Sequence, residues 1–436
     1  MFLKSVSLLI VMANITLVIG QTRQVFDFSK RGNNTLEVKY IDHPIRYTNQ
    51  GFGFDLNTDK HVQFLNAKKG NSLYSNKPFY FSVDVPEGNY KVTVIYKGLK
   101  DRTFSSTVRS ESRRWSLAKT TISKNKKLEK SFIVNIKNPK ITSSSSVKLK
   151  APRENEKLDW DNKLTLEFQG ENNIARIIVE SVENVTTLFL AGNSTVVNQE
   201  HEPWASWGQM IPRYFDKQIA VANHAESGLA LSSFMSSNRF EKILAVAKPG
   251  DFLFIEFGHN DQKEKGDKAG AYNGYSERLR LFVNKFRAIG GHPVIVTSTA
   301  RRSFDNEGNL NFTLGDYPDA ARKVAQELQV PLIDLNKMTR EFYTALGVED
   351  SKRALVHYPA NTFPDQVQPL QDNTHFNTYG AGQIAKMILK GIEQLQLPIS
   401  KNIIDFKKYS PAEPDDFKSW EWPLSILTSQ IKPDGN

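Results

Sequence analysis

The sequence predicts an all-β sandwich followed by an α/β domain built on a doubly wound parallel sheet. Between Gln21 and about Asn184, short runs alternate apolar and polar residues and are separated by polar turns, which is typical of half-buried strands. After Asn184, continuous apolar runs alternate with amphipathic stretches, which is typical of βαβ units. The chain has 436 residues, 39% of them hydrophobic, and is therefore long enough for several domains.

Five segments of the first half have the alternation expected of strands in a sandwich. Turn signals such as Pro86-Glu87-Gly88-Asn89 lie between them. The five segments are 79–85, 90–96, 132–136, 164–168 and 174–179. At the level of this strand pattern, the first half resembles the galactose-binding-like accessory domains.

The second half alternates buried strands with helices. Its apolar runs are 186–191, 219–223, 252–257, 293–297 and 331–335. Its amphipathic stretches, with a period near 3.6, are 207–214, 239–247, 275–289, 320–328, 337–346 and 379–395. In such sheets ligands bind at the carboxyl ends of the strands, so polar residues there are the first candidates for a functional site.

The first twenty residues have the features of a secretory signal. One cation, Lys4, precedes apolar stretches that close on Val18-Ile19-Gly20. The apolar part contains Asn14 and is too short for a stable membrane anchor, so we expect an exported protein, secreted or periplasmic. The expected divisions are a signal peptide at 1–20, a β-sandwich accessory domain at 21–183, an α/β domain at 184–400 and a C-terminal tail at 401–436.

The positive charge belongs to the first half. Residues 21–183 contain 29 lysines and arginines against 18 carboxylates, whereas the whole chain has a net charge of +10. Nucleic acid is the usual partner of such a surface, but export favours an acidic polysaccharide. A solvated lysine face without a partner is the alternative. The oligomeric state is not predictable from the sequence.

The absence of cysteine limits the possible chemistry. Because the sequence has no cysteine, disulfides, thiolate metal sites and a cysteine nucleophile are excluded. The histidines form no H-E-x-x-H or similar ligand cluster, so we expect no catalytic metal. No G-x-S-x-G elbow is present either, which argues against the common lipase architecture.

Four polar blocks lie at strand ends or before the last helix. They contain Ser194 in 190–195, Gly228 in 223–228, Asn260 in 258–261 and Asp372-Asn373-Thr374-His375. A serine hydroxyl needs a neighbouring base, and a histidine base needs a carboxylate to hold its tautomer. Each residue taken alone could also be a helix cap or a turn residue. The occurrence of all four blocks in order favours acyl transfer.

The order and contexts of these blocks resemble the SGNH (GDSL-type) hydrolases over residues 186–395. The resemblance implies a cofactor-free serine esterase in which Ser194 is the nucleophile, His375 the general base and Asp372 the residue that orients it. The backbone N–H groups of Ser194 and Gly228 and the side-chain amide of Asn260 would form the oxyanion hole.

Within that superfamily, blocks 190–196, 258–261 and 372–376 look most like rhamnogalacturonan acetylesterases. This resemblance implies a carbohydrate acetylesterase that removes acetyl groups from an acidic pectic polysaccharide. Asn193 stands where GDS-type members have aspartate, and Leu229-Ala230 replace an arginine and a serine, so substrate contacts there are expected to differ. The alternatives are a deacetylase of another polysaccharide such as xylan, and a carbohydrate-binding protein with an inactive α/β domain.

Overall fold

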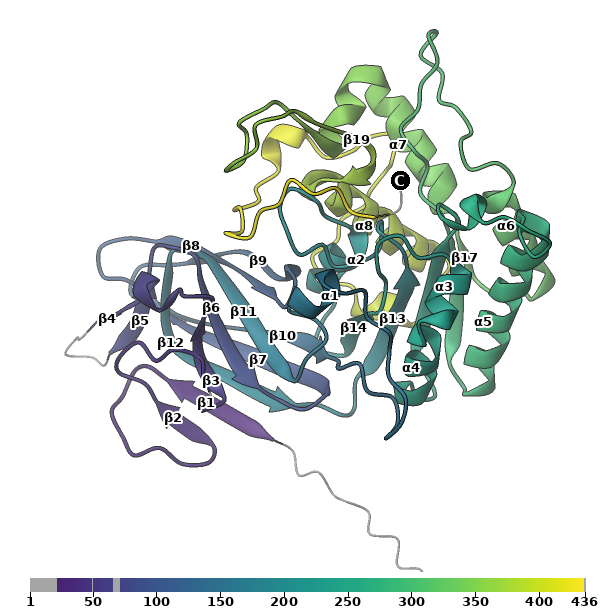
Figure 1. Cartoon of the computed structure of the whole chain (residues 1–436). Helices are drawn as coiled ribbons and strands as arrows, with labels where there is room; N and C mark the ends of the chain where they lie inside the picture. The colour runs from purple at the N-terminus through teal and green to yellow at the C-terminus, as the bar shows by residue number, and fades with distance from the viewer. Residues whose placement is uncertain (1–21, 49, 66–70, 435–436) are drawn as a thin grey trace, which may run out of the picture.

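The computed structural model describes residues 22–48, 50–65 and 71–434. A strand-rich part, coloured purple to blue, lies beside an α/β part coloured teal to green (Figure 1). The expected signal peptide at 1–20 lies outside the described residues. Within the described ranges, no helix is both long and apolar enough to cross a membrane.

The strand-rich part consists of two sheets that enclose one apolar core. One sheet has the order β10-β7-β12-β1-β2, with β5 on β12 and β4 on β5, and the other has the order β3-β6-β11-β8-β9. Phenylalanines from both sheets meet in the core, as in the edge-to-face pair of Phe26 and Phe81. The strands are β1 Arg23–Asp27, β2 Val38–Tyr40, β3 Phe52–Asp55, β4 Gln63–Leu65, β5 Ser72–Ser75, β6 Phe79–Asp84, β7 Gly88–Lys97, β8 Phe104–Ser110, β9 Arg114–Ile122, β10 Lys127–Ile136, β11 Lys163–Gly170 and β12 Asn172–Ser181.

The second part is a five-stranded parallel sheet in the order β14-β13-β15-β16-β17, which confirms the predicted fold class. Its strands are β13 Thr186–Gly192, β14 Ile219–Asn223, β15 Phe252–Phe257, β16 His292–Thr297 and β17 Leu332–Ile333. A separate antiparallel pair is formed by β18 Leu355–Tyr358 and β19 Leu370–Phe376. The helices are α1 Arg153–Glu156, α2 Trp207–Met210, α3 Leu231–Ser236, α4 Arg239–Val246, α5 Ser276–Ala288, α6 Tyr317–Glu327, α7 Leu335–Asp350 and α8 Thr378–Gln394.

Helices cover both faces of the parallel sheet because successive strand residues point to opposite sides. Leu188 and Leu190 pack with residues of α2, α7 and α8, whereas Phe189 and Ala191 pack with residues of α3 to α6. Every residue of β15 is buried. Burial on both faces explains why these strands are continuous apolar runs in the sequence.

The strands β8 and β9 were not predicted, because many of their buried residues are polar or charged and break the apolar alternation. Arg109, Arg113 and Arg114 are each at most 2% exposed. Arg109 and Arg113 lie where the strand-rich part meets the rest of the chain, and Arg113 pairs with Glu202 across that boundary at 2.5 Å. Lys242 of α4 similarly pairs with Glu87 at 2.7 Å. Buried, paired charges thus join the two parts of the chain.

Candidate active site

The carboxyl ends of β13, β14 and β15 bring three of the predicted blocks together. Residues following β14 bond directly to β13, since the His224 N–H donates to the carbonyl oxygen of Leu190 at 2.9 Å. The Asn260 side-chain amide, after β15, donates to the carbonyl oxygen of Leu229 at 3.1 Å. Ser194, Gly228 and Asn260 therefore belong to one connected edge of the sheet, as expected where parallel strands end.

Ser194 begins a buried loop fixed by its own neighbours. The Asn193 side-chain oxygen accepts from the Thr195 backbone N–H at 3.1 Å and from its hydroxyl at 2.9 Å. The Gln199 amide donates to the Ser194 carbonyl oxygen at 3.1 Å. GDS-type members of the superfamily have aspartate at this position. The Asn193 side-chain oxygen can stabilise the turn in its place, because it is also a hydrogen-bond acceptor.

Glu256, a buried residue that was not among the predicted site residues, holds this loop by a hydrogen bond. Glu256 of β15 accepts from the Thr195 hydroxyl at 2.9 Å and from the Trp207 indole at 2.6 Å. Burial raises the pKa of Glu256 to about 7, although both hydrogen bonds oppose the shift. Its place within an apolar strand was the only sequence signal, because a charged residue in such a run must be paired or neutral.

Gly228 has a backbone conformation that favours glycine. Its φ is +77°, and a Cβ there would lie 2.9 Å from the Lys150 Nζ and 3.0 Å from the Asp434 Cβ. The Gly228 position is therefore crowded by two residues far away in the sequence.

The side-chain amide of Asn260 is held in one orientation. One of its two N–H groups donates to the carbonyl oxygen of Leu229, which fixes the direction of the other N–H group.

Asp372 and His375 form a hydrogen-bonded pair in the interior. The His375 Nδ1 lies 2.7 Å from the Asp372 Oδ2, and both residues are at most 3% exposed. The other carboxylate oxygen, Oδ1, accepts from the backbone N–H groups of Thr374 at 2.9 Å and His375 at 3.0 Å. Burial raises the pKa of Asp372, but these hydrogen bonds and the His375 ring outweigh that effect and lower it well below its ordinary value.

The pair lies in a strand with a bulge, β19. In the β18–β19 ladder Leu355 faces Phe376 and His357 faces Gln371, so β19 has extra residues between these two positions. Residues three apart in a regular strand point to opposite faces, and the bulge allows Asp372 and His375 to meet.

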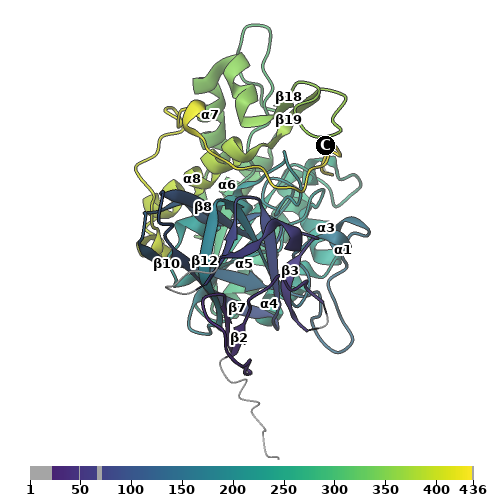
Figure 2. The same ribbon diagram turned by 90° about the vertical axis from the view of Figure 1, so that its left-hand side faces the viewer.

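The C-terminal tail lies over these blocks. Figure 2 shows the yellow segment running along the upper edge of the strand-rich part to the C-terminus. Trp420 and Trp422 pack against Trp115, so this part of the tail joins the core. Farther on, the Lys432 Nζ lies 3.6 Å from the Asp372 Oδ2, and Asp434 reaches Gly228. The tail therefore both packs on the core and lines the site.

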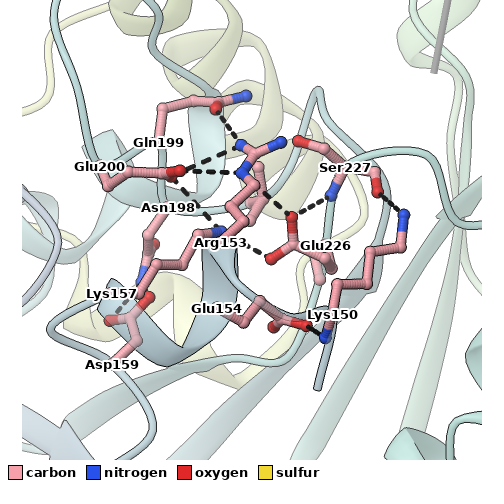
Figure 3. A network of polar contacts seen from close by, with 12 residues as sticks. Lys150, Arg153, Glu154, Lys157, Asp159, Asn198, Gln199, Glu200, Glu226 and Ser227 are labelled. Atoms are coloured by element: carbon pink, nitrogen blue, oxygen red, sulfur yellow. Dashed lines mark hydrogen bonds and ion pairs between the residues drawn. The ribbon is translucent and has the colours of Figure 1, made fainter. Parts of the chain in front are cut away.

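A network of charges beside Ser194 was also absent from the sequence-based expectations. Lys157 pairs with Glu226 at 2.6 Å, and Arg153 donates to Glu200 at 2.8 Å (Figure 3). The Arg153 guanidinium also donates to the side-chain oxygen of Gln199 at 3.1 Å. These cations come from the segment between β10 and β11, so the strand-rich part contributes directly to the surroundings of the nucleophile candidate.

Two further histidines, His224 after β14 and His259 after β15, lie in the interior. His224 and His259 are at most 2% exposed, and burial lowers the pKa of each well below its ordinary value. Neutral, buried rings of this kind fit a packing role. Across the part of the chain that is described, no group of three or more His, Cys, Asp or Glu residues is arranged to hold a metal ion.

Comparisons with known proteins match the same region of the chain. The family model described as GDSL-like Lipase/Acylhydrolase matches residues 190–381. Rhamnogalacturonan acetylesterase RhgT of Bacillus subtilis is 43% identical over 219 residues, which are 50% of this chain and 94% of that protein. A probable rhamnogalacturonan acetylesterase of the same organism, YesY, is 33% identical over 50% of this chain and 97% of its own length.

A solved structure is similar over a larger share of the chain. The crystal structure of the YXIM protein of Bacillus subtilis covers 86% of this chain and 99% of its own, at 21% identity and a TM-score of 0.46.

Proposed function

Since this chain belongs to the GDSL-like lipase/acylhydrolase family, we propose that it is a carbohydrate acetylesterase that removes acetyl groups from rhamnogalacturonan outside the cytoplasm. The relatives named as rhamnogalacturonan acetylesterases support the substrate class. The apolar first twenty residues support export, to the medium or the periplasm.

The observation that carries the proposal is the buried hydrogen bond between Asp372 and His375. A carboxylate bonded to Nδ1 keeps the proton on that nitrogen and leaves Nε2 as the base. Two backbone N–H groups hold the opposite carboxylate oxygen, so the pair is fixed before any substrate arrives. This arrangement suits a general base more than a structural cap.

In the proposed reaction the Ser194 Oγ attacks the acetyl carbonyl carbon while His375 Nε2 takes the hydroxyl proton. The tetrahedral intermediate collapses, its bond to the sugar oxygen breaks, and His375 returns the proton to that oxygen. Water then attacks the acetyl-serine with the same histidine as base, and acetate leaves. Asp372 stabilises the imidazolium that forms in each half-reaction.

The negative oxygen of each tetrahedral intermediate needs preorganised donors. We assign this role to the backbone N–H groups of Ser194 and Gly228 and to the Asn260 amide. The hydrogen bond from Asn260 to Leu229 supports the assignment because it fixes the amide before reaction.

Acetate release from acetylated rhamnogalacturonan, acetylated xylan and a small aryl acetate tests the proposal. Ser194→Ala should reduce turnover of all three by at least about a thousandfold, and Ser143→Ala, an exposed loop serine, should leave it unchanged. Residual activity above about a hundredth would refute the serine mechanism. Faster turnover of xylan would reassign the substrate, and no activity on any ester would favour a carbohydrate-binding role.

A further inference from the structure

A cleft of about 800 Å³ lies beside Gly228 and is lined by three separate parts of the chain. Lys150 and Arg153 come from the segment between β10 and β11, Gln199 from the loop after β13, and Lys432 and Asp434 from the tail. Gln199 also bonds to Ser194, so the cleft adjoins the proposed nucleophile.

Lys150 reaches the edge of the proposed oxyanion hole. Its Nζ donates to the carbonyl oxygen of Ser227 at 2.6 Å, immediately before Gly228 (Figure 3). Its side chain is 34% exposed. The ammonium group can therefore keep this hydrogen bond and still use its other two N–H donors toward a molecule in the cleft.

The backbone of Lys150 is held in place by buried residues. Its N–H donates to the Glu154 Oε2 at 2.8 Å, and Glu154 forms an ion pair with Arg239. Both Glu154 and Arg239 are at most 1% exposed. A cation on such a support needs little reorganisation to bind an anion, which favours recognition.

The carboxylates nearest to this site are already paired with other cations. Glu226 bonds to Lys157, and Glu200 to Arg153. Among the described residues, the ion-pair partner of Lys150 is Asp434, at 3.5 Å, on the 62% exposed side chain of a tail residue. Thus the carboxylate of Asp434, which is exposed and can exchange with another anion, lies next to the Lys150 ammonium at the cleft.

We propose that Lys150 binds a uronate carboxylate of the substrate beside the acetylated sugar, and that this carboxylate displaces Asp434. The inference rests on the proposed function for its substrate, an acidic polysaccharide. It makes a residue outside the α/β part a specificity-determining residue of the esterase. Asp434 then acts as an internal competitor that occupies the position until substrate arrives.

Kinetics on matched polymers test the proposal. On acetylated rhamnogalacturonan, Lys150→Met should raise KM about five- to tenfold, as expected for one lost charge-assisted contact at a partly exposed site, whereas Lys150→Arg should change it far less. On the same polymer with its carboxyl groups reduced, the rise should stay below about twofold. Asp434→Asn should lower KM for the acidic polymer. The exposed Lys124→Met is the matched control.

An equal rise in KM for the acidic and reduced polymers, or a fall in kcat alone, would overturn the carboxylate role. An unchanged KM in Asp434→Asn would overturn the displacement. Calorimetry separates this inference from the proposed function, because it needs no turnover. In the Ser194→Ala protein, oligogalacturonate should bind more tightly than its methyl ester, and adding Lys150→Met should abolish that difference. Equal binding of both probes would refute the role of Lys150, whatever the esterase assays show.

Discussion

Replacing Asp372 by asparagine tests whether the buried pair orients a catalytic base. The structure determines which way the new amide points. Oδ1 accepts from two backbone N–H groups, those of Thr374 and His375, so an amide nitrogen placed there would face two donors. The amide oxygen therefore stays toward the backbone, and the amide nitrogen faces the His375 Nδ1, 2.7 Å away in the parent protein.

An N–H donor facing Nδ1 selects the tautomer that carries its proton on Nε2. That histidine cannot accept the Ser194 proton, and the imidazolium also loses its carboxylate partner. In a serine protease the equivalent change lowers kcat by about 10⁴, which corresponds to about 5.4 kcal/mol of transition-state stabilisation, and we expect a loss of that order here. Two backbone hydrogen bonds survive the replacement, so the fold should remain intact.

Steady-state hydrolysis of a small aryl acetate near neutral pH measures the effect, and thermal unfolding checks the fold. Asp350→Asn, an exposed carboxylate paired with Arg353, provides the matched control. If folded Asp372→Asn protein retained more than about a hundredth of parental kcat, Asp372 would not set the tautomer of His375. A normal kcat with raised KM would instead place the pair in substrate binding.

Further predictions concern single groups. Asn260→Ala should lower kcat about 10² to 10³-fold with little change in KM, and a change confined to KM would reassign the amide to binding. Burial raises the pKa of Glu256 to about 7, whereas the unfolded chain loses this proton near pH 4.5, so the free energy of unfolding should decrease as the pH rises from about 4.5 to about 7. Glu256→Gln should reduce this pH dependence, as measured by thermal unfolding at several pH values. Lys157→Met leaves the buried Glu226 with only the more distant Arg153, at 3.8 Å, as an ion-pair partner. This variant should lower the free energy of unfolding by about 3 kcal/mol in denaturant titrations, whereas Lys124→Met should not change it. Raising salt from about 0.05 to 0.5 M should raise KM for the acidic polymer but not for the aryl acetate, since the Debye length shrinks.

Much of the α/β part could be predicted from the sequence because its signals are local. A strand buried on both faces is a continuous apolar run, and a helix on a sheet has a period near 3.6. The predicted run 252–257 coincides with β15, and 379–395 differs from α8 by one residue at each end. Ser194, Gly228 and Asn260 could be found as candidates because polar residues directly follow such strands.

The strand-rich part was less predictable because its buried surface is partly ionic. In β8 and β9, Arg109 and Arg114 are as buried as leucines would be, and a buried arginine looks the same in a sequence as an exposed one. Their burial depends on carboxylates supplied by other segments, such as Glu167 for Arg109. No local periodicity reports a partner of that kind.

The sequence by itself determined the order of the layers, the edge of the sheet that holds the candidate nucleophile, and the spacing of Asp372 and His375. Only the tertiary structure decided that a bulge brings those two side chains together, that Glu256 supports the serine loop, and that Lys150 and Asp434 meet at Gly228. The physical reason is how far apart along the chain the interacting residues lie. Helix and strand periodicity arises between neighbours a few residues apart, whereas the pairing of Lys150 with Asp434 spans 284 residues and exists only after both parts have packed.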